Sequence, residues 1–325
     1  MRLCQEVQSQ MMMRLLIIKD YLKKIYGNHT AYVEPALKFA VSVISMLVIN
    51  ANIGFMGVLK NPAIMILIGL LCAFVPSGMI LGILIIFMIA NIYSLSLELS
   101  LIVAVVMIIM YILFFRFTPE EGYVVLLMPI LFCVKVPYLM PIILGLMATP
   151  VSLISISFGV ILYFIIYSIG ENAAVISNSG ESGIAKVTSV FTDAFSNKEM
   201  YLFVVAFAVT LIVVYVLRKK SMDYAASVAI IAGGITDIIV ILSGIVLFEI
   251  DTISKMGMII FCMLLSIGIA YIVQFFILAV DYSRTEYVQF EDDDYYYYVK
   301  AVPKVTVASQ DVQVKRINVR KIKND

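Results

Sequence analysis

The chain has 325 residues, of which 62% are hydrophobic and only 14% are charged, and its net charge is +1. Soluble globular domains carry about 25% charged residues, so a water-soluble fold of this composition would leave large apolar areas wet. The composition therefore excludes a soluble enzyme, a secreted disulfide scaffold and a disordered chain, and the net charge gives no indication of a nucleic-acid partner. We expect the lipid bilayer to be the solvent of this chain, because about 20 apolar residues span a bilayer.

The N-terminal segment, residues 1–35, is polar and basic. Within it, Leu15, Ile18, Leu22 and Ile25 recur at helical spacing, which predicts an amphipathic helix. Such a helix either lies in the headgroup region on the cytoplasmic side or docks as an ordinary helix on the rest of the protein.

Residues 36–280 form the predicted transmembrane domain, which consists of about ten apolar segments. The sequence therefore predicts an all-α, polytopic integral membrane helical bundle. The apolar runs are 36–59, 62–75, 78–94, 97–116, 122–134, 138–148, 151–170, 201–217, 224–247 and 256–280.

Four of these runs are short for an upright span, and they form two pairs, each broken by a Val-Pro dipeptide at Pro76 or Pro137. Proline lacks a backbone donor and disfavours helix in the residue before it. Each pair is therefore either a tight two-helix crossing or a re-entrant hairpin. We also expect helix breaks at Pro141 and at Gly233 and Gly234.

The distribution of Lys and Arg predicts the orientation in the cell membrane. With the N-terminus inside, Arg116, Arg218 and the C-terminal tail also fall inside, so both termini are expected to be cytoplasmic. Residues 171–200 then form an external loop, and its apolar residues between Ile184 and Phe195 recur at helical spacing. We expect a short helix there, lying on the outer face.

The two broken pairs share a short pattern. Residues 70–79 and 131–140 have Leu, Cys, Val, Pro and Met at equal spacing, and a long run follows each pair. The first half would enter the membrane from outside and the second from inside. This inverted layout is typical of many secondary transporters, although apolar sequences also match each other by chance.

Two charged residues, Lys135 and Asp237, lie inside apolar runs. At about 1.5 Å per helical residue, Lys135 lies about 20 Å and Asp237 about 18 Å from the cytoplasmic surface. Charges at this depth are costly and usually find a partner, so we expect an ion pair between them. The pair either lines a substrate or ion path or is a static structural contact.

Neutral polar residues also lie at membrane depth, among them Asn50, Asn52 and Asn91. Amide side chains of this kind either line an aqueous path, together with Lys135 and Asp237, or make hydrogen bonds between helices.

The tail, residues 281–325, carries Tyr295, Tyr296, Tyr297, Tyr298 and Val299 in sequence. Aromatic and β-branched residues favour strands, and 45 residues of this composition bury too little apolar surface for a core of their own. We expect this short β-prone stretch to bind a cytoplasmic protein, or another copy of the chain, by strand addition.

The tail also resembles a group of known sequences. The stretch from Asp281 to Tyr287, with the Tyr run and the segment from Val299 to Lys304, is similar to the tail of uncharacterised polytopic membrane proteins of anaerobic, clostridial-type Gram-positive bacteria. Such proteins are sometimes labelled permeases. The resemblance covers residues 281–304 and carries no binding or catalytic residues to this chain.

These features favour a secondary-transporter-like protein or permease component for a small solute or ion. The alternative is a non-transporting membrane scaffold of a cell-envelope assembly, which would recruit partners through the tail. We expect no enzymatic activity, no metal and no cofactor. The chain has neither a Gly-rich phosphate loop nor a nucleophile elbow, and its four cysteines and one histidine lack metal-ligand spacing.

Overall fold

The computed structural model describes residues 2–178, 192–193, 195–220, 222, 224–248, 256–278, 286–291 and 296–301. The chain divides into two units, of which the larger spans Ile25–Ile277 and the smaller combines Met1–Lys24 with Leu278–Asp325. The larger unit is helical throughout its regular structure, as the composition predicts.

Each predicted apolar run forms one α-helix. The helices are α1 (Arg2–Ile53), α2 (Pro62–Phe74), α3 (Ser77–Tyr93), α4 (Leu97–Phe117), α5 (Gly122–Val134), α6 (Leu139–Met147), α7 (Leu153–Asn178), α9 (Lys198–Arg218), α10 (Ala225–Leu247) and α11 (Met256–Leu278). Short 3-10 turns at Gly57–Lys60, Pro119–Glu121 and Pro150–Ser152 precede α2, α5 and α7.

Six of the helices in the described part of the chain are long and apolar enough to cross a membrane. They also expose large apolar side chains: on α4, Leu101 is 60% exposed and Ile112 is 62% exposed. A soluble protein rarely exposes apolar surface of this extent, whereas lipid tails cover it readily. The chain is therefore a multi-pass α-helical membrane protein.

Helix α1 is much longer than a single span. It is kinked at His29, where φ is −125° and ψ is 26°, and its apolar part from His29 to Ile53 forms the first span. The helix predicted within residues 1–35 is thus present over the described residues, and it continues directly into the span. Its position on a membrane surface stays a prediction.

The α2–α3 pair is broken where the sequence predicts. Val75 is extended, and Pro76 is the N-cap of α3. The turn packs against the connection between α4 and α5, because a Cβ at Gly78 would lie 2.8 Å from the carbonyl oxygen of Pro119. The pair thus reaches the end of the bundle at which α4 stops, which indicates a crossing rather than a re-entrant loop.

The geometry of the α5–α6 pair favours the re-entrant alternative. Glu121, just before α5, accepts hydrogen bonds from Ser152 and Ser155, just after α6, so both ends of the hairpin lie together. Helix α6 has nine residues and rises only about 14 Å, too little for a span. The chain reverses at Lys135, whose backbone is left-handed with φ 64° and ψ 28°, and at Pro137.

Three of the predicted helix breaks are wrong. Pro141 lies in the first turn of α6, where the backbone N–H needs no helical acceptor. Gly233 and Gly234 lie inside α10, which continues through them without interruption. The two pairs also differ at their true breaks, since Val75 is extended and Lys135 is left-handed, so the predicted repeat extends to helix order but not to local geometry.

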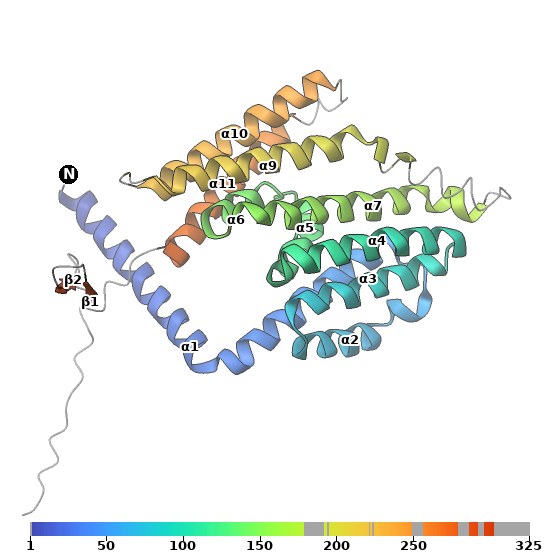
Figure 1. The fold of residues 1–325 in the computed structure, drawn as a ribbon, viewed down its shortest axis with the longest axis horizontal. Helices are drawn as coiled ribbons and strands as arrows, with labels where there is room; N and C mark the ends of the chain where they lie inside the picture. The colour runs from blue at the N-terminus through green and yellow to red at the C-terminus, as the bar shows by residue number, and fades with distance from the viewer. Residues whose placement is uncertain are drawn as a thin grey trace, which may run out of the picture. The chain divides into compact units, whose positions relative to one another are not determined.

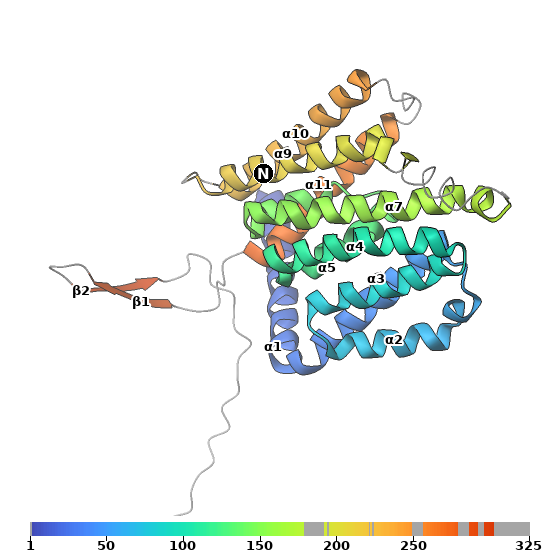
Figure 2. The ribbon, with the colours of Figure 1, turned by 45° about the vertical axis from the view of Figure 1, so that its right-hand side comes forward.

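The core of the larger unit has two halves that meet along α7. Helix α7 lies between α4 on one side and α9 on the other (Figure 1, Figure 2). The first half is built by α1 to α5 with α7, around residues such as Met46, Met88 and Phe114. The second half is built by α5, α6, α7 and α9 to α11, around residues such as Met128 and Phe207.

The smaller unit contains the only two strands in the described part of the chain. Strands β1 (Glu286–Glu291) and β2 (Tyr296–Ala301) pair antiparallel, with Glu286 opposite Ala301 and Glu291 opposite Tyr296. The β-prone stretch is thus confirmed as a strand from Tyr296 to Val299. Tyr295 and most of the predicted helix over 184–195 lie outside the described residues.

A buried carboxyl beside a re-entrant hairpin

Asp237 lies near the middle of α10 and is 1% exposed. The hydroxyl of Thr210, on the neighbouring helix α9, donates a hydrogen bond of 2.8 Å to Oδ1 of Asp237. The other oxygen, Oδ2, is buried and has no hydrogen-bond partner among the described residues. A carboxyl oxygen in this state is unusual, because buried polar atoms are nearly always paired.

Two glycines allow α10 to bring this carboxyl into the core. A Cβ at Gly233 would lie 2.3 Å from Cγ2 of Val214 on α9, and a Cβ at Gly234 would lie 2.3 Å from Cδ1 of Ile267 on α11. Either side chain would collide with its neighbour. The glycine pair therefore serves close packing of three helices one turn before Asp237, a role of small residues in membrane bundles.

The tip of the re-entrant hairpin approaches the same carboxyl. Tyr138, which follows Pro137 in the turn, is 5% exposed and lies within electrostatic range of Asp237. Its ring lies 6.1 Å from that of Phe207 and 6.2 Å from that of Phe203, both on α9. The hairpin thus contributes an aromatic hydroxyl residue to the surroundings of Asp237, where the sequence led us to expect a lysine.

An aromatic cluster holds the hairpin in place. Phe132, in the last turn of α5, stacks on Tyr163 of α7 with ring centroids 4.2 Å apart and planes at 7°. The same ring meets Phe203 edge-on at 5.2 Å. Such aromatic pairs contribute about 0.5–1.5 kcal/mol each beyond burial of area. The tip is therefore anchored from two sides, by α7 and by α9.

The predicted ion pair between Lys135 and Asp237 is wrong. Lys135 is exposed, and its Nζ lies 3.9 Å from Sδ of Met258 on α11. The left-handed backbone that ends α5 directs this residue away from the core. Equal depth does not ensure contact, because the direction of a side chain depends on the backbone at the turn.

The predicted path residues Asn50, Asn52 and Asn91 lie on α1 and α3, in the first half of the core. Asn50 donates to the carbonyl of Leu59, and Asn91 accepts from the N–H of Met56 while donating to its own helix. Asn52 donates to a carbonyl one turn earlier in α1. These amides support the 54–61 loop and helix backbones, and the structure does not bring them together with Asp237.

A polar clasp closes the base of the hairpin, and its role was not evident in the sequence. Ser155 Oγ lies 2.8 Å from both Thr118 Oγ1 and Glu121 Oε2, and Ser152 also donates to Glu121. Because a hydroxyl has one proton, Ser155 donates to the carboxylate and accepts from Thr118. The segment around Thr118 resembles a helix start, and nothing local shows that Glu121 has partners 31 and 34 residues later.

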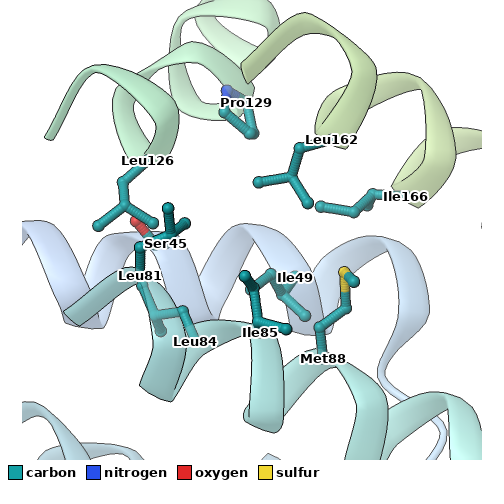
Figure 3. Close-up of a pocket in the computed structure, with 10 residues that line it drawn as sticks. All are labelled: Ser45, Ile49, Leu81, Leu84, Ile85, Met88, Leu126, Pro129, Leu162 and Ile166. Atoms are coloured by element: carbon teal, nitrogen blue, oxygen red, sulfur yellow. The ribbon is translucent and has the colours of Figure 1, made fainter. Parts of the chain in front are cut away.

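An apolar pocket lies in the first half of the core, between α1, α3, α5 and α7 (Figure 3). It has about 350 Å³ of space, including its open mouth. Ser45 is its one polar lining residue, and the hydroxyl of Ser45 already donates to the carbonyl of Val41. The pocket thus offers no free polar group to a solute. The lining residues are Ser45, Ile49, Leu81, Leu84, Ile85, Met88, Leu126, Pro129, Leu162 and Ile166.

Among the described residues, no group of three or more His, Cys, Asp or Glu side chains gathers in one place. Comparisons with protein-family models, with curated proteins and with solved structures found no match. Function is therefore inferred from the residues of this chain alone. The Asp237 site can bind and release one proton, or pair with one cationic group.

Proposed function

We propose that this chain is a secondary-transporter-like membrane protein, or a permease component, which moves a small solute or ion and has Asp237 at its site. The observation that carries the proposal is the buried Oδ2 of Asp237, which lacks a partner in the middle of an apolar helix. Ionisable residues in this position are costly and usually functional.

The surroundings of Asp237 support the same function. In many transporters the site lies near the bilayer midplane, where interrupted helices meet. Here the interrupted α5–α6 hairpin ends beside Asp237 and contributes Tyr138. A purely structural carboxyl would be expected to have both oxygens paired, as both oxygens of Glu121 are.

Access to the site requires movement, because Asp237 is 1% exposed and Thr210 is fully buried. The hairpin tip is the element whose displacement would open the site, since Tyr138 lies within electrostatic range of Asp237 and belongs to the turn between α5 and α6. The clasp at Glu121 would keep the base in place during this movement. Transport would then involve two positions of the tip around a fixed base.

Solid-supported membrane electrophysiology on proteoliposomes tests the proposal. Concentration jumps of amino acids, sugars, nucleosides, organic cations and organic anions are applied in turn. We expect at least one class to evoke a charge movement in the wild-type protein that D237N lowers at least tenfold and that K135Q preserves. Wild-type currents that D237N leaves unchanged would refute the role of Asp237.

The alternative, a membrane scaffold, is favoured by one observation, the β1–β2 hairpin in the tail. A two-stranded hairpin is marginally stable in isolation and has open edges that can pair with another strand. Deletion of residues 295–325 separates the two functions. A transporter keeps its solute-evoked currents after the deletion, whereas a scaffold loses its function and tolerates D237N.

We also propose that the protein lies in the cell membrane with both termini in the cytoplasm. The basis is the excess of Lys and Arg in the tail and beside Arg116 and Arg218. Reporter fusions at the C-terminus test it: a fluorescent protein should be active there, and an alkaline phosphatase should not. An active phosphatase would show that the C-terminus lies outside the cell, which contradicts the proposed orientation.

A further inference from the structure

We propose that the ion bound at Asp237 is a proton rather than a metal cation, and that Oδ2 carries it. This inference rests on the proposed function of the site and specifies its coupling ion. It follows from the number of oxygen atoms around the carboxyl, from the direction of the Thr210 hydrogen bond and from the absence of a cationic partner among the described residues.

The oxygen ligands around Asp237 are too few for a metal ion. Hard cations such as Ca²⁺ and Mg²⁺ take about six or more oxygen ligands. Among the described residues, the carboxyl has one hydrogen-bond partner, the hydroxyl of Thr210, and it belongs to no cluster of three or more acids, cysteines or histidines. One turn earlier on α10, the atoms nearest to the two glycines are all carbon atoms, which belong to Val214, Thr210, Ile142 and Ile267. A proton needs only one oxygen atom.

We place the proton on the carboxyl oxygen that is not bonded to Thr210. The hydroxyl of Thr210 donates to Oδ1, so Oδ1 acts as an acceptor. In a neutral carboxylic acid one oxygen accepts and the other bears the O–H group. The unpartnered Oδ2 is the position left for that O–H group, and neutrality is the form that an apolar environment favours.

The titratable groups near the site do not supply a countercharge. Tyr138, at the hairpin tip, lies within electrostatic range of Asp237, of Cys262 on α11 and of Glu199 on α9. None of these is a cation, and Lys135 lies against Met258 instead. In the closed state Asp237 therefore stays protonated. When the tip opens, the O–H bond at Oδ2 breaks, water or the solute takes the proton, and the carboxylate keeps the electron pair.

Infrared difference spectroscopy on the full chain in proteoliposomes measures this proton without any solute. The C=O stretching band of a protonated carboxyl is well separated from carboxylate bands. At neutral pH we expect the wild-type protein to show such a band in D₂O buffer, D237N to lack it, and T210V to shift it to higher frequency because the hydrogen bond to Oδ1 is lost. T210S should restore the wild-type frequency.

A second experiment replaces choline chloride in the buffer by NaCl or MgCl₂ and tests whether a metal cation binds at Asp237. We expect the carboxyl band and the thermal unfolding temperature of the wild-type protein to stay unchanged. Absence of the band in the wild-type protein would overturn the assignment of a proton to Asp237. A rise in unfolding temperature with Na⁺ or Mg²⁺ that D237N abolishes would also overturn it, in favour of a metal cation. Neither outcome depends on transport, so a failed transport assay and a failed proton assignment are distinguishable.

Discussion

Asn91 and Asp237, one in each half of the helical core, are buried polar side chains with different partners. In the first half, the Nδ2 group of Asn91 donates to its own helix and the Oδ1 atom accepts from the N–H of Met56. In the second half, Asp237 has one oxygen bound by Thr210 and one with no partner among the described residues. Both side chains are at most 1% exposed.

The difference separates a structural polar residue from a functional one. An amide at the end of a span makes hydrogen bonds to the backbone of a loop and of its own helix. A carboxyl in the middle of a span, with an oxygen free, is suited to a ligand that comes and goes. Neither burial nor one unpartnered oxygen alone distinguishes them, because Oδ1 of Asn50 is also buried without a partner; the distinction is the ionisable group in the middle of a span.

Matched leucine substitutions should break this comparison most clearly. D237L should lower solute-evoked current at least tenfold and leave the unfolding temperature in detergent equal or higher, because an unpaired buried polar atom is removed. N91L should keep the current and lower stability by about 1–3 kcal/mol, since the N–H of Met56 loses its acceptor. Both proteins would be compared in the same proteoliposome and thermal assays. Equal effects on current would contradict the division between the halves.

Removal of the clasp at the hairpin base should have the next largest effect. E121A removes the acceptor of Ser152 and leaves Ser155 with Thr118 as its remaining partner, and we expect a loss of about 2 kcal/mol in the free energy of unfolding. E120A is the matched control, because Glu120 is exposed and precedes Glu121 in the same turn. Denaturant titration in detergent measures both. A loss in E120A as large as in E121A would show that the turn, not the clasp, was disturbed.

The sequence predicts the existence and order of the helices because the signal is local. Each span needs a run of apolar residues, and each such run is visible by itself. The breaks at Pro76 and Pro137 follow from the covalent chemistry of proline, which acts on the nearest residues. Whether a broken pair crosses or returns was not predictable, since it depends on where the helices end and what the turn contacts: the α2–α3 turn meets Pro119 after α4, whereas α6 has only nine residues.

Of the site, the sequence predicts Asp237 but not its partner, because only the first depends on a local signal. Asp237 stands out because a charge in an apolar run is expensive, and this cost is a property of one position. Its partner was assigned incorrectly, because Thr210 is an ordinary residue in a membrane helix and Lys135 has a left-handed backbone that depth estimates ignore. The sequence predicts a helix break at Gly233, because a glycine that allows close packing of a neighbouring helix cannot be told in sequence from one that ends a helix.

Adding one carbon atom should sharpen the comparison of packing at the site. In G233A the new Cβ would lie 2.3 Å from Cγ2 of Val214, and we expect a loss of about 1–2 kcal/mol in stability. G268A, on α11, adds the same atom where no other heavy atom lies within 4 Å, and should be neutral or stabilising by up to about 1 kcal/mol. Thermal unfolding in detergent compares them. A stable G233A would contradict the close approach of α9 and α10.

The smallest effect is expected at Lys135, the residue that the structure removes from the site. K135Q should change solute-evoked current less than twofold, because the side chain is exposed and its Nζ lies beside the sulfur of Met258 rather than beside Asp237. K135G should raise stability by up to about 1 kcal/mol, since glycine adopts the left-handed conformation without the Cβ strain of other residues. Because that gain depends only on backbone conformation, its absence would point to a different turn. A tenfold loss of current in K135Q would restore this lysine to the site of Asp237.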